Sequence, residues 1–125
     1  MATPGFTEIF ERLRKRLLVY AGQMEVRSPP SACHLYIVND VELAGRKYKE
    51  CYFSGVAIKK TMVAFYFFPI YSHPGQLSVP AAIQKNLKGK SCFNFSSLSD
   101  EQEKAVAELL EAGAVFYRAQ HILPA

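Results

Sequence analysis

Aromatic residues and a few cations are the residues of this sequence whose chemistry best suits a ligand. Tyrosines and phenylalanines recur in segments typical of strands, and lysine and arginine follow in segments expected to flank them. Pockets for small molecules are mostly apolar, with a few convergent polar groups. We therefore predict a site for a small anionic or planar ligand, formed by Tyr36, Phe53, Tyr66, Tyr71, Lys90 and Arg118.

The same aromatic residues allow two other interpretations. Tyrosine is enriched at subunit interfaces, so these side chains would also suit a second core layer or the contact of a homodimer. Stacking of nucleic-acid bases is the other interpretation. The sequence lacks an RNP-type motif, so we do not expect nucleic acid as a partner.

Residue types typical of catalysis are present, but not in the patterns that catalysis uses. His34, His73 and His121 lie far apart without metal-ligand spacing, and Cys92 lies in an apolar segment that favours an inert buried thiol. The sequence has no Gly-rich phosphate loop, Cys-x-x-Cys pair, His-Glu-x-x-His or nucleophile elbow. We predict no catalytic residue and no cofactor.

Length and composition indicate one domain spanning residues 1–125. No run approaches the ~20 apolar residues of a membrane span, and the N-terminus mixes charged and apolar residues unlike a signal peptide, so we expect a cytoplasmic protein without a membrane partner. The net charge of +4 is unevenly distributed: residues 1–97 carry 13 Lys and Arg against 6 Asp and Glu, and residues 98–125 carry 2 against 5.

The segment from Cys51 to Tyr71 predicts the central hairpin of a sheet, because it is rich in β-branched and aromatic residues and charged only at Lys59 and Lys60. A two-residue turn there would pair Val56 with Val63 and place Phe53 and Cys51 on a second surface with Tyr66. Neither surface is polar, so helices should cover one, and a loop, a partner or a ligand the other. A longer loop would change this register.

Helices are expected at both ends of the chain. Apolar residues at three- and four-residue spacing predict a helix over about 4–21, with Glu8 and Glu11 four residues before Arg12 and Lys15. Ser99 followed by Gln102 matches a capping box and predicts a helix to about Gln120, with a glycine at position 113 that permits close packing; a break there is the alternative.

Shorter elements complete the expected order α-β-β-β-β-α-β-α. We predict an edge strand at 23–27, strands at 33–38, 41–43 and 91–95, a polar loop at 45–50 and a short helix at 79–87. Hairpins rather than βαβ crossovers predict an α+β fold: one two-layer domain, with an antiparallel sheet and the N- and C-terminal helices packed on one face.

The blocks GVAI, FFPIY and GKSCFNF, in this order and followed by a capped helix ending near AGAVFYR, resemble the YdhG-like family of small bacterial proteins. The likeness covers about residues 30–120 and leaves the N-terminal helix of about 4–21 outside it. It implies a frataxin-like α+β fold. Most members have no established function, and some are labelled intracellular iron chaperones.

The resemblance makes an iron chaperone the alternative to a binding or interaction module, our leading interpretation. Iron would need hard carboxylate oxygens on one surface, but the first helix is mainly basic. The acids recur on the last helix instead, at Glu101, Glu108 and Glu111, which form the alternative metal site. A third possibility is an unrecognised enzyme with a pocket between the sheet and the C-terminal helix.

Overall fold

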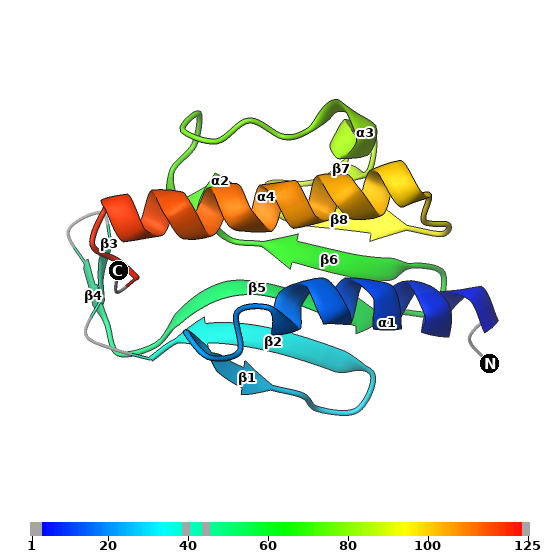
Figure 1. The fold of residues 1–125 in the computed structure, drawn as a ribbon, viewed down its shortest axis with the longest axis horizontal. Coiled ribbons are helices and arrows are strands. Elements are labelled where there is room, and N and C mark those ends of the chain that lie inside the picture. The colour runs from blue at the N-terminus through cyan, green and yellow to red at the C-terminus, as the bar shows by residue number, and fades with distance from the viewer. Residues whose placement is uncertain (1–3, 39–40, 44–45, 124–125) are drawn as a thin grey trace.

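The computed structural model describes residues 4–38, 41–43 and 46–123, which form two layers. A six-stranded antiparallel sheet has the order β1-β2-β5-β6-β8-β7, and a separate two-stranded sheet pairs β3 with β4. The long helices α1 and α4 lie together on one face of the larger sheet (Figure 1). The bounds are α1 Pro4–Leu18, β1 Glu25–Arg27, β2 Ala32–Ile37, β3 Val41–Leu43, β4 Arg46–Tyr48, β5 Cys51–Ile58, β6 Val63–Phe67, α2 Pro69–Ser72, α3 Ala81–Gln84, β7 Leu87–Lys88, β8 Cys92–Phe95 and α4 Asp100–Ala119.

This architecture confirms the predicted α+β fold with an antiparallel sheet and a helix from each end of the chain. Ser99 caps α4 as predicted: its hydroxyl accepts from the backbone N–H of Gln102 at 3.1 Å, and the Gln102 side chain accepts from the Ser99 N–H at 2.8 Å. The helix continues through Gly113 without a break. None of the helices in the described ranges is both long and apolar enough to cross a bilayer.

The central hairpin of β5 and β6 forms, but its predicted two-residue turn is wrong. Ile58 pairs with Val63 and Val56 with Phe65, so the loop has four residues, closed by a 2.8 Å hydrogen bond from the Lys59 N–H to the Met62 carbonyl. Two lysines at the positive φ values of a tight turn would be strained, which favours the longer loop. A shift of two residues keeps each side chain on its predicted face.

A β-bulge in β5 changes those faces near Phe53. Leu35 of β2 pairs with Ser54, but Tyr36 pairs with Tyr52, so Phe53 is an extra residue on β5. Both Phe53 and Ser54 are therefore fully buried, and Tyr52 takes the opposite face. The predicted position of Phe53 on the second surface is wrong for this reason, as is that of Cys51, which is buried opposite Ile37.

Three short elements also differ from the sequence predictions. Residues 46–48, expected in a polar loop, pair as β4 with β3. The helix expected at 79–87 is confined to α3, and Leu87 and Lys88 pair with β8 as an edge strand. The strand predicted to continue to Tyr71 ends at Phe67, because Pro69 starts the single turn of α2.

The core lies between the sheet and the two long helices. It contains Leu13 and Leu17 from α1 and Leu109, Leu110 and Tyr117 from α4, all at most 1% exposed. The sheet contributes aromatic rings that contact one another, with Phe53 and Phe67 at 5.8 Å and Phe65 and Phe93 at 5.7 Å between centroids. Burial of such large side chains is the main stabilising contribution to the fold.

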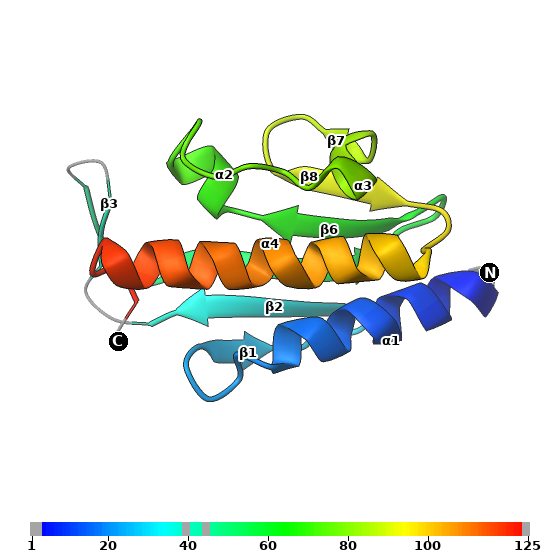
Figure 2. The same ribbon diagram turned by 45° about the horizontal axis from the view of Figure 1, so that its top comes forward.

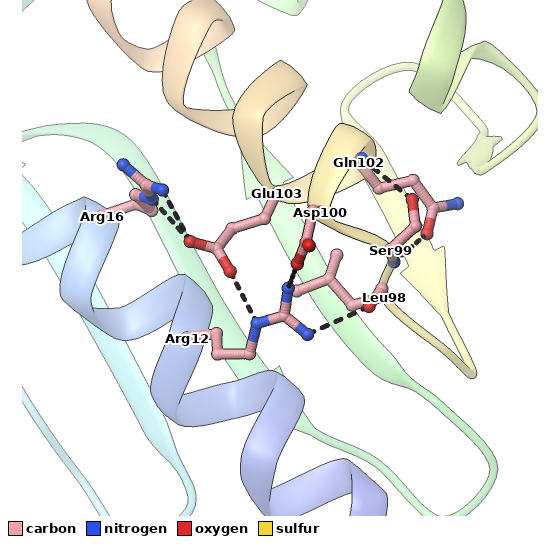
Figure 3. A network of polar contacts seen from close by, with 7 residues as sticks. All are labelled: Arg12, Arg16, Leu98, Ser99, Asp100, Gln102 and Glu103. Atoms are coloured by element: carbon pink, nitrogen blue, oxygen red, sulfur yellow. Dashed lines mark hydrogen bonds and ion pairs between the residues drawn. The ribbon is translucent and has the colours of Figure 1, made fainter.

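An ion-pair network joins the C-terminal half of α1 to the first turn of α4 (Figure 3). Arg12 Nε donates to Glu103 Oε1 at 2.6 Å, and Arg16 Nη2 lies 2.7 Å from Glu103 Oε2. Arg12 also donates to the Leu98 carbonyl and to Asp100, each at 3.0 Å. Burial alone would raise the pKa of Glu103, but the hydrogen bonds from the two arginines outweigh it and hold that pKa below its usual value.

Replacing Gly113 with alanine should destabilise the protein, although alanine is the better helix former. A Cβ at this position would overlap the Phe67 ring, lying 2.9 Å from its Cε1, and would lie 3.3 Å from Pro69 Cγ. Overpacking costs about 1–3 kcal/mol, which outweighs a gain of about 1 kcal/mol in helix propensity. Urea unfolding should show a net loss of about 1 kcal/mol. Gly5→Ala is the matched control in α1, where nothing lies within 4 Å, and it should not destabilise. Equal stability of the two variants would contradict this packing.

Removing the charge of Glu103 should weaken the contact between the helices in a pH-dependent way. Because the folded-state pKa is lowered, its contribution is present above the pKa of the unfolded chain and disappears as pH falls through the folded pKa. Glu103→Gln should therefore lower the free energy of unfolding by about 0.5–1 kcal/mol at pH 7, and by less at pH 3, in urea titrations. Glu108→Gln, an exposed residue of the same helix, is the control. A loss of the same size at both pH values would count against the ion pairs.

Candidate functional site

The face of the sheet opposite the two long helices carries the candidate site, and we call it the open face. Figures 1 and 2 show α1 and α4 on the other side of the strands, and no described helix crosses this one. Strand register places there His34 and Tyr36 of β2, Tyr52, Gly55 and Ala57 of β5, Ala64 and Tyr66 of β6, and Cys92 and Asn94 of β8.

Four rings form a continuous cluster on the open face. Tyr52 is at its centre: its ring centroid lies 5.2 Å from that of Tyr36 and 5.5 Å from that of His34. The His34 ring in turn lies 6.4 Å from Tyr66. A hydrogen bond of 2.8 Å joins His34 Nδ1 to the Tyr52 hydroxyl. All four side chains are half-buried, so the cluster is both fixed by its own contacts and accessible to a ligand.

Small residues beneath the cluster explain how these rings lie across the strands. A Cβ on Gly55 would overlap both the Tyr52 hydroxyl and His34 Nδ1, and would lie 3.0 Å from the Cys33 carbonyl. The nearby Ala57 and Ala64 are only 6% and 2% exposed although they belong to the open face. The aromatic side chains of the open face therefore cover part of its small residues, so less apolar surface is left for a partner to bury.

Burial favours the uncharged forms of His34, Tyr52 and the neighbouring Cys92. Burial lowers the pKa of His34, and the positive charge of Lys59 lowers it further. Burial raises the pKa of Tyr52, with further contributions from Tyr36 and Tyr66. Burial also raises the pKa of Cys92, so its thiol stays protonated and is a poor nucleophile. The cluster is suited to stacking and hydrogen bonding rather than to covalent chemistry.

The structure brings only two of the six predicted ligand residues together on the open face, Tyr36 and Tyr66. Phe53 is fully buried against Tyr117 and Phe67 in the core, because of the bulge. Arg118 lies on α4, on the opposite side of the sheet, and its guanidinium donates to the Gln23 side chain. The single six-residue site expected from the sequence is not formed.

Tyr71 and Lys90 lie together, but at a second location. They line a pocket of about 400 Å³ with Ile70 and Pro74, where α2 meets the turn between β7 and β8. The Lys90 ammonium lies 5.6 Å from the centroid of the Tyr71 ring. These two residues of the predicted site are therefore neighbours, but apart from the open face.

The sequence reasoning missed His34 and Tyr52 as members of the aromatic surface. His34 has a detectable signal, because it lies two residues before Tyr36 in a strand and must share its face. Tyr52 has no such signal in the sequence. Strict alternation along the strand from Val56 places Phe53, not Tyr52, on the surface that the structure shows to be the open face. Arg27 was also missed: its guanidinium lies 4.2 Å from the Tyr36 ring centroid and pairs with Glu25 and Glu50.

The alternative metal site and the alternative enzyme pocket receive no support from the geometry. The described residues contain no group of three or more His, Cys, Asp or Glu side chains placed to hold a metal ion, and Glu111 instead accepts a 2.8 Å hydrogen bond from Tyr20. Glu101 and Glu108 are exposed on α4. The space between the sheet and α4 is packed, with Phe67 fully buried beneath Gly113.

A polar contact between α2 and α4 places a serine beside a histidine, a pairing that nucleophilic catalysis can use. Ser72 Oγ lies 2.9 Å from His73 Nδ1, a distance suited to nucleophile activation, but also 2.6 Å from the Tyr117 hydroxyl. The Tyr117 side chain is fully buried, and the His73 ring packs on Phe116 at 5.0 Å. These contacts join α2 to the C-terminal half of α4, which is a structural role.

The lowered pKa of His34 predicts a pH dependence of stability. In the folded protein the neutral imidazole is favoured, so between the folded pKa and about 6.5 the unfolded chain binds more protons. The stability of the wild type should fall as pH decreases from 7 through this interval, and the decrease should be smaller in His34→Asn. Urea titrations from pH 7 to 5 measure it. The control is His121→Asn at an exposed residue with φ of 61°, which asparagine tolerates. A decrease of the same size in all three proteins would exclude His34 as its cause.

Comparison of the chain with models of known families, with curated proteins and with solved structures gave no match. The resemblance to the YdhG-like family therefore stays a prediction, and the open face and the pocket at Tyr71 have to be interpreted from their own geometry.

Proposed function

We propose that this protein is a small binding module that takes a planar, anionic ligand on the open face of its sheet. The observation that carries the proposal is the four-ring cluster of Tyr36, Tyr52, His34 and Tyr66 on the sheet face opposite the two long helices. Aromatic side chains stack against planar groups, and half-buried tyrosines add polar hydroxyls that can orient them.

The rigidity of the platform supports binding. The rings belong to the three central strands of the sheet, and the backbone below them is fixed by ladder hydrogen bonds. Beneath the platform, the buried Ser54 hydroxyl donates to the Tyr66 carbonyl at 2.6 Å. A platform with fixed rings loses little conformational entropy when a ligand binds, which favours affinity.

The charge around the platform supports an anionic ligand. Residues 51–98 carry five lysines and no Asp or Glu. Lys59 lies close enough to His34 and Cys92 for its positive charge to act on both: it adds to the lowering of the His34 pKa and offsets part of the rise that burial causes in the Cys92 pKa. Lys88 pairs with Cys92 at the edge of the open face. Cations beside an aromatic surface attract a group that combines a flat ring with a negative charge.

A second protomer is the alternative occupant, because the same tyrosines suit a subunit interface. The two proposals predict different effects of removing one of the aromatic rings. If the face binds a ligand, ligand affinity falls and the oligomeric state is unchanged; if the face is a subunit interface, the dimer dissociates. Native mass spectrometry on protein purified without added metal reports the mass of the assembly and any ligand retained with it.

Adenosine monophosphate is a suitable probe for the open face, because it joins a flat base to a phosphate. We expect it to shift the amide resonances of β2, β5 and β6 in NMR titrations. Tyr66→Ala should weaken it about tenfold, since stacking on one aromatic ring contributes about 1–3 kcal/mol. Tyr71→Ala, a tyrosine outside the open face, is the matched control and should bind as the wild type does.

Three results would count against a ligand site on the open face. One is the absence of shifts at millimolar probe. The second is a loss of binding in Tyr71→Ala but not in Tyr66→Ala, which would place the ligand at α2. The third is a dimer in native mass spectra that Tyr66→Ala dissociates, which would assign the face to subunit contact.

A further inference from the structure

The pocket beside α2 is a second concave surface, separate from the ring cluster. Its volume of about 400 Å³ lies in the range of small-molecule sites, and its walls are Ile70, Tyr71, Pro74 and Lys90. Three of these four residues offer apolar or aromatic surface, and the fourth carries a positive charge.

Local backbone structure fixes the aromatic wall of the pocket. Pro69 starts α2 directly after β6, and the Tyr71 N–H donates to the Phe68 carbonyl at 2.8 Å. The Phe68 ring supports the Tyr71 ring from one side, with 5.6 Å between centroids. Tyr71 nevertheless remains 49% exposed, which is high for a large aromatic residue that packs on a neighbouring ring. Part of its ring is therefore free to contact a ligand.

The cationic wall is fixed by the β7–β8 turn. Gly89 has φ of 74°, a value that favours glycine, and it turns the chain so that Lys90 reaches toward α2. The next residue is tied to the sheet, because the Phe67 N–H donates to the Ser91 carbonyl at 2.9 Å. Lys90 and Tyr71 are thus held on opposite sides of the end of β6, with the ammonium 5.6 Å from the ring centroid.

We infer that this pocket binds a small aromatic carboxylate. Its ring would pack on Tyr71 between Ile70 and Pro74, and its carboxylate would take the Lys90 ammonium as partner. The residues that line the pocket all belong to the stretch 51–98, which carries lysines but no Asp or Glu, and this local charge favours an anionic ligand. An apolar cavity with one cation at its edge selects for a ligand with one flat apolar part and one negative group.

Benzoate is the probe that tests the inference, in NMR titrations of the whole chain labelled with ¹⁵N. We expect shifts at residues 68–75 and 89–91. Lys90→Gln should weaken benzoate at least fivefold, and Lys85→Gln, at an exposed lysine after α3, is the matched control and should leave it unchanged. Tyr71→Leu should also weaken it, since leucine keeps apolar bulk but loses the flat ring. The dispersion of each variant's amide spectrum checks that it folds.

Two further probes separate the charge from the ring. Benzamide has the same shape without the charge and should bind at least fivefold more weakly than benzoate; inorganic phosphate has charge without a ring and should not shift Tyr71. Equal binding of benzoate and benzamide, or unchanged binding by Lys90→Gln, would overturn the inference. So would benzoate shifts confined to Tyr36, Tyr52 and Tyr66, which would instead favour the open face.

Discussion

The bulge at Phe53 in β5 is the local distortion on which both faces of this sheet depend. It turns Phe53 and Ser54 toward the helices and leaves Tyr52 on the opposite face. Phe53 then contacts Tyr20 after α1, Phe67 in β6 and Tyr117 in α4, so one side chain joins the sheet to the C-terminal ends of both long helices. Its carbonyl also accepts from the Phe68 N–H at 2.9 Å, which fixes the end of β6 where α2 begins. An extra residue in one strand thus sets the core contacts and the neighbouring surface together.

The same bulge accounts for the chemistry of the open face. Because Tyr52 emerges there, its ring can extend across β5 to the position above Gly55 and meet His34. A larger residue at position 55 would prevent this contact. Without these rings, the apolar strand β5 between its apolar neighbours would expose a flat surface that tends to aggregate. The tyrosine and histidine rings instead offer hydroxyl and imidazole groups to water. The face is therefore a polar-edged aromatic surface, compatible both with a monomer in water and with a planar ligand.

The sequence predicted well those features that depend on near neighbours in the chain. The Ser99 capping box, the length of α4 and the strands at 33–38 and 91–95 follow from local spacing and turn residues, and the structure confirms them with small shifts at the ends. Features that depend on pairing between distant segments were missed. The four-residue loop after Ile58 and the bulge at Phe53 arise from the register against β2 and β6. Arg12, expected to pair with Glu8 one turn earlier, pairs with Glu103 of α4. Of the predicted ligand residues, Phe53 was misplaced because its face follows from that register, and Tyr71, Lys90 and Arg118 lie on elements away from the open face.

The distribution of ion pairs explains why the candidate surfaces are positive although the net charge is modest. In the described part of the chain, the ion pairs engage Arg12, Arg14, Arg16 and Arg27 with carboxylates of α1, α4 or the region of β1. The acids of α4 that take part are thus directed to α1 and away from the sheet. The half of the sheet from β5 to β7 carries only lysines as charged residues, and it includes the pocket beside α2 and the part of the open face outside β2. The fold separates charge in space as the sequence does along the chain, and an anionic ligand is the partner that this separation favours.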